Sequence, residues 1–328
     1  MNNKNPPIVI TCGDPAGVGP EVAVSAWKAL REKIPLCILI DPDFLPKNIN
    51  IKILDQAPLL SDVEKNVLTV IRHKFAENRV PGKPNPKNAG ATIKAVERGV
   101  NFIKNKQCSA ICTMPISKSV LKDGANFSFP GHTEYLAHLD GKNTYGMMLV
   151  NKYLRVVPAT IHIPIKDITK YLSAELIEKT IKTTHKELTS RFSISNPSIW
   201  ISGLNPHAGE TGTIGDEEQK IITPVIRKLQ SEGINLIGPI SADTMFYKKK
   251  RNKFDAAVCM YHDQALLPIK TLDFHSSVNL TIGLSFIRTS PDHGTAFDIA
   301  GKNLANPTST IEALKLAWNL SKKEQSNH

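Results

Sequence analysis

Long apolar runs and an export signal are missing from this chain of 328 residues. An apolar run such as residues 35–40 is far shorter than the roughly 18 residues that a membrane-spanning helix needs. No basic and then apolar leader precedes the first strand-like segment, Ile8–Thr11. We therefore expect a cytoplasmic protein that makes no membrane contact.

Cysteine is scarce, and its spacing argues against covalent or metal cross-links. The five cysteines leave one unpaired in any set of disulfides and form no Cys-x-x-Cys pair. Most of them lie inside apolar runs. We expect buried thiols rather than disulfides or zinc ligands.

The common nucleotide-binding fingerprints are also absent. In "TCGDPAGVGPE", residues 11–21, the glycines do not have the G-x-G-x-x-G spacing, and no Gly-Lys-Ser/Thr follows. The segment suits a tight strand-to-helix turn at least as well as a ligand loop, and the residues leave both open. There is no low-complexity linker, internal repeat or heptad pattern, so the length predicts about two domains joined by short crossings.

The net charge of +11 comes from 41 basic and 30 acidic residues spread over the whole chain. The densest basic cluster, residues 248–253, has no alternating aromatics, which favours a solvated helix end or loop over a nucleic-acid patch. A nucleic-acid-binding protein is the rival of another class and predicts salt-sensitive binding. A basic enzyme for anionic substrates explains the charge as well, so we expect no nucleic-acid partner.

Short apolar runs alternate with longer amphipathic stretches along the chain. The pattern predicts strands at residues 8–11, 36–40, 110–113, 147–150, 199–202 and 256–260, and helices at residues 21–31, 89–104 and 217–231. Such alternation is typical of an α/β fold with largely parallel sheets covered by helices on both faces.

Three histidines each follow a strand-like run: His162, His207 and His262. A single histidine in such a place is more often structural than a ligand. Three imidazoles with an open position, however, are a catalytic zinc arrangement. The three lie tens of residues apart, so their spacing cannot show that they meet, and both interpretations stay open.

Two further segments suit an anionic ligand. His132 and Thr133 stand just before a helix-like run, where free amides, an imidazole and a hydroxyl favour an anion; a helix cap explains Thr133 equally well. Lys270, Asn279 and Arg288 recur at about nine-residue steps and offer two cations and an amide to a doubly anionic ligand. Surface charge is the alternative, which the apolar neighbours of Arg288 disfavour.

Seven segments, taken together and in order, resemble the 4-hydroxythreonine-4-phosphate dehydrogenase family of the vitamin B6 pathway. They are "GDPAGVGPE", "TMPISK", "GHTEYLA", "NPHAGE", "GPISADTMF", "YHDQALLPIK" and "RTSPDHGTAFDIAG". The resemblance implies an isocitrate/isopropylmalate dehydrogenase-like fold: two α/β/α domains with an active-site cleft between them, in a homodimer with a shared active site. It implies a first domain of residues 1–128 and 285–328, which carries the nucleotide loop. The second domain, residues 129–284, would carry the metal and dimer contacts.

The implied reaction is NAD-dependent oxidation of 4-phosphooxy-L-threonine followed by decarboxylation to 3-amino-2-oxopropyl phosphate, in pyridoxal phosphate (pyridoxine) biosynthesis. The family's metal ligands fall on His162, His207 and His262, and its substrate contacts on His132, Thr133, Lys270, Asn279 and Arg288. An imidazole set suits zinc, with magnesium or cobalt as alternatives. Asp243 and Asp263 are candidates to orient an imidazole or relay the hydroxyl proton.

"DHGTAFDIAGKNLANP" also resembles the adenosine-binding loop of isopropylmalate dehydrogenases, which implies cofactor contacts at His293, Gly294, Thr295, Asp298 and Asn306. Asp298 stands where those enzymes place a carboxylate on the ribose. Because a carboxylate accepts hydrogen bonds from free hydroxyls and repels a 2′-phosphate, we expect NAD rather than NADP.

Three departures from the family pattern remove no proposed ligand: Cys12, Ser117 and Ser285 stand where many relatives carry proline or asparagine. The nearest rival is a sister dehydrogenase that acts on 4-phospho-D-threonate or a cyclic dihydrodiol carboxylate. A substrate without phosphate would have less use for two cations and the His132 segment. The residues do not separate the two phosphorylated substrates.

Overall fold

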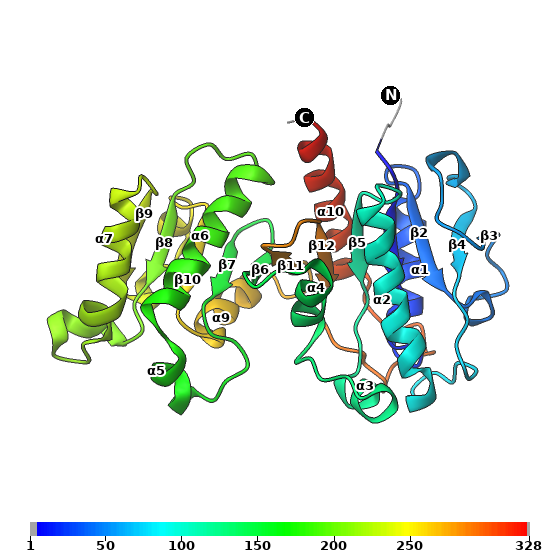
Figure 1. Cartoon of the computed structure of the whole chain (residues 1–328), viewed down its shortest axis with the longest axis horizontal. Helices are drawn as coiled ribbons and strands as arrows, with labels where there is room; N and C mark the ends of the chain where they lie inside the picture. The colour runs from blue at the N-terminus through cyan, green and yellow to red at the C-terminus, as the bar shows by residue number, and fades with distance from the viewer. Residues whose placement is uncertain (1–4, 327–328) are drawn as a thin grey trace. The chain divides into compact units, whose positions relative to one another are not determined.

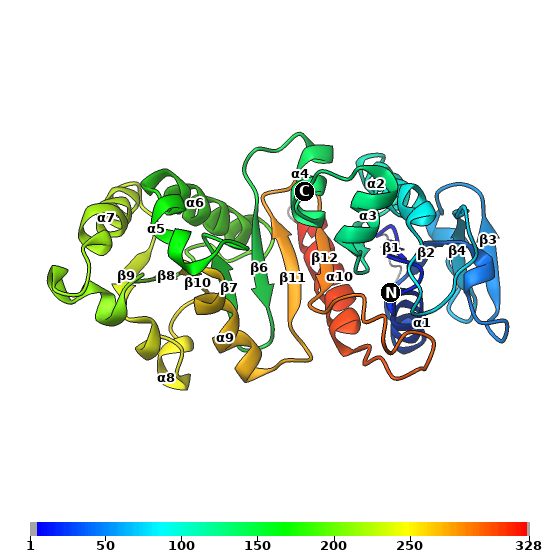
Figure 2. The same cartoon turned by 90° about the horizontal axis from the view of Figure 1, so that it is seen from below.

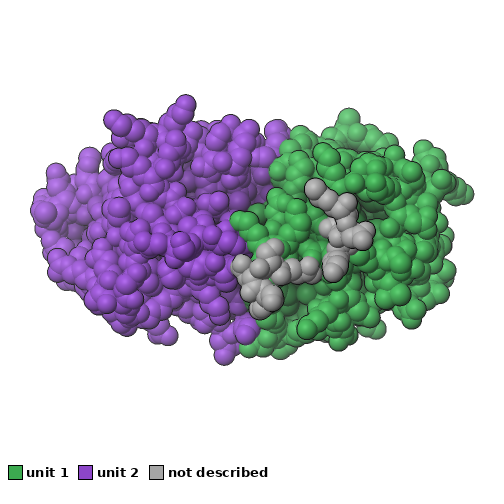
Figure 3. Space-filling view, turned by 90° about the horizontal axis from the view of Figure 1, so that it is seen from above, with its two compact units in different colours: residues 1–141, 284–328 green, residues 142–283 purple. Residues whose placement is uncertain are grey.

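The computed structural model describes residues 5–326, and its helices and strands are labelled in Figure 1. The chain divides into two compact units, coloured in Figure 3. Unit 1 consists of residues 1–141 and 284–328, and unit 2 of residues 142–283. Both units combine a sheet with helices, so the predicted α/β class is confirmed.

The sheet of unit 1 is parallel, and its strand order is β3-β4-β2-β1-β5-β12. The strands are β1 (Ile8–Thr11), β2 (Leu36–Ile40), β3 (Ile51–Leu54), β4 (Leu68–Arg72), β5 (Ala110–Thr113) and β12 (Arg288–Pro291). β1, β2 and β5 are buried along their whole length. Continuous apolar strands of this kind are expected in a parallel sheet with helices on both faces.

Five helices cover this sheet: α1 (Gly19–Leu30), α2 (Ala89–Lys104), α3 (Lys118–Ala125), α4 (His132–Asp140) and α10 (Thr308–Ser326). Figure 2 shows α1 and α10 on one face and α2 and α4 on the other. The buried residues of α2 include Thr92, Val96, Gly99 and Val100. This three- and four-residue spacing gives one apolar stripe, which packs on the sheet.

Residues 129–141 lie in unit 1, although the resemblance implied that they belong to the second domain. The reason is the apolar side of α4. Tyr135, Leu136 and Ala137 are buried in the same core cluster as Val9 and Ile111 of the unit 1 sheet.

The sheet of unit 2 has the strand order β11-β6-β7-β10-β8-β9. The strands are β6 (Gly146–Val150), β7 (Arg155–Pro158), β8 (Ile199–Ser202), β9 (Leu236–Ile240), β10 (Ala256–Cys259) and β11 (Val278–Ile282). β7, β10, β8 and β9 pair in parallel, but β6 is antiparallel to both β7 and β11. The tight turn at Asn151, whose Oδ1 accepts from the amides of Tyr153 and Leu154, permits an antiparallel pair only.

The helices of unit 2 are α5 (Ile168–Tyr171), α6 (Ala174–Ser190), α7 (Thr223–Ser231), α8 (Lys248–Arg251) and α9 (His262–Leu272). A π-helical turn, Glu218–Ile222, precedes α7 within the predicted helix of residues 217–231. All five cysteines of the chain are buried and unpaired, as expected. Of the helices in residues 5–326, none is both long and apolar enough to span a bilayer.

Candidate functional site

The three predicted histidine ligands follow three neighbouring strands of unit 2. His162 comes after β7, His207 after β8 and His262 after β10, and β10 lies between the other two strands in parallel register. The carboxyl ends of these strands therefore meet at one edge of the sheet, where ligands of open α/β sheets bind.

His162 and His262 are brought side by side. Their ring centroids are 5.8 Å apart. Backbone contacts fix the two loops to each other, because the Ala159 amide donates to the Cys259 carbonyl at 2.7 Å and the Thr160 hydroxyl to the Met260 carbonyl at 2.7 Å. The two rings line a pocket of about 170 Å³.

Asp263 contacts the ring of His262. The distance from His262 Nδ1 to Asp263 Oδ1 is 2.6 Å. With the proton on Nδ1, the imidazole donates to the carboxylate and keeps a lone pair on Nε2, which is the state that binds a metal. The predicted orienting function of Asp263 fits this geometry and stays a prediction.

His207 lines a neighbouring pocket of about 320 Å³, together with Asp243, and Tyr261 lines both pockets. The loop that carries His207 is tied down by the buried Glu218. Its Oε1 accepts from the amides of Leu204 and Asn205, each at 2.7 Å. These two bonds hold the loop in place.

Asp243, the other predicted acid, is stabilised in its charged form. The Ser241 hydroxyl donates to Asp243 Oδ1, and this bond, with a smaller contribution from the charge of His207, lowers the pKa of the carboxyl from its usual range. Asp243 is thus an ionised acceptor at the pocket of His207.

Gln264 joins the ends of β8 and β10, a function that was not predicted from the sequence. Its Oε1 accepts from the Ser202 hydroxyl at 2.6 Å and the Met260 amide at 2.7 Å, and its Nε2 donates to the Gly203 carbonyl at 2.7 Å. The side chain is buried. The sequence signal that could have indicated this function is a polar residue on the otherwise apolar, buried side of α9.

The donor chemistry of these residues fits a divalent transition metal. Within residues 5–326 the side chains form no ready cluster of three or more histidine, cysteine or acidic groups. His162 and His262 are adjacent, and His207 faces the next pocket. Two neighbouring imidazoles, one in contact with a carboxylate, are typical of zinc or cobalt ligands. The participation of His207 stays a prediction.

In unit 1, Arg288 places a cation in the protein interior. It is the first residue of β12 and is 2% exposed. Its Nε and Nη2 donate to the Thr113 hydroxyl at 3.1 and 2.7 Å. Burial lowers the pKa of the guanidinium to about 10, so it remains charged at neutral pH.

His132 lies near this cation and begins α4. Burial, and to a smaller extent the charge of Arg288, lowers the pKa of the imidazole well below its usual value. Its Nε2 is buried and has no hydrogen-bond partner among the described residues. The helix cap, Gly131, supplies no side-chain acceptor to the first turn, where Thr133 also lies. A neutral imidazole, free helix amides and a buried guanidinium suit an anionic group.

The other two predicted substrate residues, Lys270 and Asn279, belong to unit 2. Lys270 lies in α9, and its Nζ is 5.3 Å from the ring centroid of Phe274. Asn279 lies in β11, and its Oδ1 is buried without a partner in residues 5–326. The five predicted substrate residues are therefore divided between the units.

The predicted nucleotide loop, residues 292–307, lies in unit 1 between β12 and α10. Asp298 is exposed, and the Cα of Gly294 faces open space. His293 Nδ1 donates to the Gly294 carbonyl at 2.9 Å, while its Nε2 is buried and lacks a partner among residues 5–326. Asn306 Oδ1 accepts from the Thr308 amide at 2.9 Å, so capping α10 already explains it. An accessible carboxylate and an orphaned ring nitrogen in the same loop fit a nucleoside.

Two solved structures of similar fold are dehydrogenases. A 4-hydroxythreonine-4-phosphate dehydrogenase from Klebsiella pneumoniae has a TM-score of 0.87 and 32% identity, covering 97% of this chain and 100% of that one. A terephthalate 1,2-cis-dihydrodiol dehydrogenase from Burkholderia xenovorans has a TM-score of 0.67 and 27% identity, covering 96% and 98% of the two chains.

The chain belongs to the family described as pyridoxal phosphate biosynthetic protein PdxA, whose model matches residues 22–317. Relatives named 4-hydroxythreonine-4-phosphate dehydrogenase are similar over their whole length. The one from Roseobacter denitrificans is 51% identical over 318 residues, which are 97% of this chain and 98% of the relative. The one from a Ruegeria species is 48% identical with the same coverage.

Proposed function

We propose that this chain oxidises 4-hydroxythreonine 4-phosphate with NAD and then decarboxylates the product to 3-amino-2-oxopropyl phosphate, in pyridoxal phosphate biosynthesis. The main observation is the similarity to the Roseobacter denitrificans relative, which is named for this substrate. It is 51% identical and is matched over 97% of this chain and 98% of its own length. The buried Arg288 beside the unpartnered His132 nitrogen supports it, because a substrate with a phosphate and a carboxylate needs such an anion site.

Arg288, His132 and Thr133 bind one anionic group of the substrate. The two bonds to Thr113 hold the guanidinium in place before the substrate arrives, so little side-chain entropy is lost on binding. Burial strengthens the attraction, because the surrounding protein screens charge less than water does. Lys270 and Asn279 complete the predicted substrate set.

His162, His207 and His262 are the residues that would hold a divalent ion, with zinc preferred and cobalt or magnesium as alternatives. When bound, the ion supplies Lewis-acid polarisation of the substrate oxygen. Asp263 fixes the tautomer of His262 through the 2.6 Å contact to Nδ1. Asp243, which lines the pocket of His207, or Asp263, which contacts His262, relays the hydroxyl proton.

Residues 293–306 would hold the adenosine half of NAD, which would supply the hydride acceptor. The exposed Asp298 accepts from the ribose hydroxyls and repels a 2′-phosphate, which favours NAD over NADP.

A homodimer is the assembly that unit 2 supports. Nine of the thirteen exposed large apolar side chains in the described residues belong to unit 2. In and just after α9, Leu267 is 65% and Phe274 is 60% exposed, on either side of Lys270. Exposed apolar surface marks interaction sites. We expect Leu267→Lys to lower the molar mass seen by light scattering from dimer to monomer; a wild-type monomer would contradict this.

The test of the activity is NADH formation by metal-replete protein with three substrates in parallel: 4-hydroxythreonine 4-phosphate, 4-phospho-D-threonate and a cis-dihydrodiol carboxylate. We expect turnover of the first, and its loss in His262→Ala. Turnover of threonate phosphate alone would move the chain to a sister activity on the same residues. Turnover of the dihydrodiol alone would match the Burkholderia xenovorans structure and overturn the phosphate assignment.

A further inference from the structure

The glycine-rich segment "GDPAGVGPE", residues 13–21, touches the nucleotide loop directly. The Val18 amide donates to the Thr295 carbonyl at 2.9 Å. At Gly17 the two backbones come so close that a Cβ would lie 2.7 Å from the Thr295 carbonyl oxygen. Any larger residue at position 17 would push the loop away.

A third segment, residues 79–82, supports the same loop from another side. The Gly82 amide donates to the Ala16 carbonyl at 2.8 Å. Gly82 has a φ of +77°, and a Cβ there would lie 2.8 Å from the Phe297 carbonyl oxygen. A side chain at Gly17 or Gly82 would clash with the nucleotide loop, so the close packing of the three segments requires glycine at both positions.

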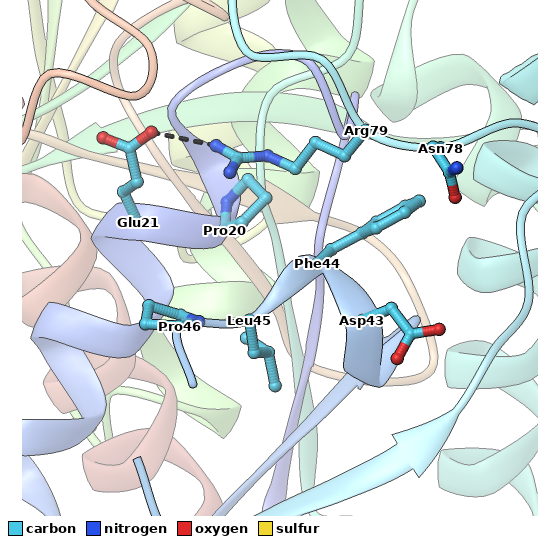
Figure 4. A pocket seen from close by; sticks show the side chains of 8 residues that line it. All are labelled: Pro20, Glu21, Asp43, Phe44, Leu45, Pro46, Asn78 and Arg79. Carbon is cyan, nitrogen blue, oxygen red and sulfur yellow. Dashed lines mark hydrogen bonds and ion pairs between the residues drawn. The ribbon is translucent and has the colours of Figure 1, made fainter. Parts of the chain in front are cut away.

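The carboxylate of Glu21 joins all three segments. Arg79 Nη2 donates to Glu21 Oε1 at 2.9 Å, and Arg79 Nε donates to the Pro15 carbonyl at 2.7 Å. The Gly301 amide of the nucleotide loop donates to the same Glu21 oxygen. Figure 4 shows the pair at the side of a pocket of about 410 Å³, and each side chain is 14% exposed.

Removing Arg79 affects the nucleotide loop through Glu21, since Glu21 accepts hydrogen bonds from both Arg79 and Gly301. Glu21 Oε2 is buried and has no partner among residues 5–326, so the carboxylate depends strongly on Arg79 for its charge balance. A nearly buried carboxylate that loses its counter-ion is destabilised in its position. Movement of the carboxylate weakens the bond that Gly301 donates, and the loop loses one of its supports.

We propose that Glu21 and Arg79 are positioning residues for the cofactor: they hold the nucleotide loop in its binding shape and so set the affinity for NAD without touching it. This inference rests on the proposed NAD site at residues 293–306. It also gives the segment of residues 13–21 a function, since this segment supports the loop instead of binding the ligand.

The test measures Arg79→Ala with two readouts. NADH binding is followed by fluorescence titration of the metal-replete protein, and hydrogen exchange of residues 295–303 is followed without cofactor. Loss of a charge-assisted hydrogen bond predicts roughly 10- to 100-fold weaker NADH binding and faster exchange. The KM for NAD rises by a similar factor, while kcat and the KM for the substrate stay within about twofold. Arg79→Lys keeps the charge but not the fork of donors, so it restores part of the affinity.

Two matched variants separate positioning from general stability. Arg72→Ala removes an exposed pair with Asp55, 2.8 Å long, in the same unit. Arg191→Ala removes a buried pair with Glu187, 2.9 Å long, in unit 2. We expect the first to change nothing and the second to lower Tm with unchanged NADH affinity.

Three results would overturn the inference. In the first, wild-type protein binds NADH and Arg79→Ala binds it equally well, which leaves the proposed function intact. In the second, Arg79→Ala loses kcat, both affinities and Tm together, which is the behaviour of a structural residue. In the third, wild-type protein binds no NADH, and the cofactor assignment fails together with the inference. Should Arg79→Ala fail to fold, Glu21→Gln gives the same comparison with the side-chain shape kept.

Discussion

The two units place their polar residues at strand ends in different ways. In unit 1 the guanidinium of Arg288 is 2% exposed and is bonded to Thr113. In unit 2 the side chain of His262 is 38% exposed; Asp263 contacts its ring, and Gln264 bonds to the amide of Met260 at the end of β10. Unit 1 therefore holds a buried charge, whereas unit 2 carries an accessible imidazole that is a predicted metal ligand. The difference suits an anion on the first and an exchangeable metal ion on the second.

The largest expected effect tests the buried cation. Arg288→Met should lower kcat/KM by roughly 30-fold to several thousand-fold, since losing a buried hydrogen-bonded charge costs about 2–5 kcal/mol. Lys270→Met, at a less buried cation of unit 2, should cost less. Steady-state kinetics with the phosphorylated substrate measure both. Equal losses of kcat/KM in the two variants would contradict the expected difference between the buried and the accessible cation.

The next effect tests how unit 2 orients its ligands. Asp263→Asn should weaken binding of the divalent ion about 10- to 100-fold, because the amide no longer fixes the tautomer of His262. Competition with a chelator measures the affinity. Asp167→Asn is the control, since Asp167 lies in unit 2 outside both histidine pockets. Unchanged affinity in Asp263→Asn would show that the 2.6 Å contact does not orient the imidazole.

A smaller effect concerns the junction of β8 and β10. Gln264→Leu leaves the Ser202 hydroxyl, the Met260 amide and the Gly203 carbonyl without their partner. We expect a loss of about 1–3 kcal/mol in the free energy of unfolding, since these groups are buried. Urea denaturation measures it against Gln219→Leu, an exposed position. A loss no larger than that of the control would contradict the bridging function.

The smallest expected effect is a pH dependence of the folding stability, which comes mainly from groups in unit 1. Burial lowers the pKa of His73 below its ordinary 6.5, and the neutral ring is held by Ala91 and Arg98. The unfolded chain therefore binds the proton more readily than the folded one. This contribution to stability is present above pH 6.5 and is lost as the pH falls below it, by at most about 1.4 kcal/mol per pH unit.

Denaturation at several pH values between about 7.5 and 5.5 checks this. His73→Gln keeps a donor for the Ala91 carbonyl but cannot titrate, so its stability should fall less steeply with acid. His132, also in unit 1, has a lowered pKa and supplies part of the slope that remains. If the stability of His73→Gln falls with acid as steeply as that of the wild type, His73 does not contribute to the pH dependence.

The sequence predicted the elements whose pattern is local. The bounds of β1, β2, β5, β8 and α2 agree with the predicted segments, because each is a short apolar run or one amphipathic stripe. β12 was not predicted, since its first residue is the charged Arg288, whose burial depends on Thr113, 175 positions away. The turn that makes β6 and β7 antiparallel was also missed.

The candidate site was predicted less completely for the same reason. The strand-end positions of His162, His207 and His262 follow from local pattern, as does the start of α4 at His132. The residues that support them do not. Gln264 reaches Ser202 across 62 positions, and Arg79 reaches Glu21 across 58. A single sequence carries no sign of such long-range partners, because each looks like an ordinary polar residue.

Unit 1 is built from both ends of the described chain, and this order affects how the protein is made. During synthesis β5 emerges early, but its neighbour β12, together with α10, which covers it, comes only after all of unit 2. The nascent chain thus has a contiguous unit 2 that can fold while β5 still has an open side. Arg288 is synthesised after Thr113 and after all of unit 2, so the hydrogen bonds between Arg288 and Thr113 can form only late in synthesis.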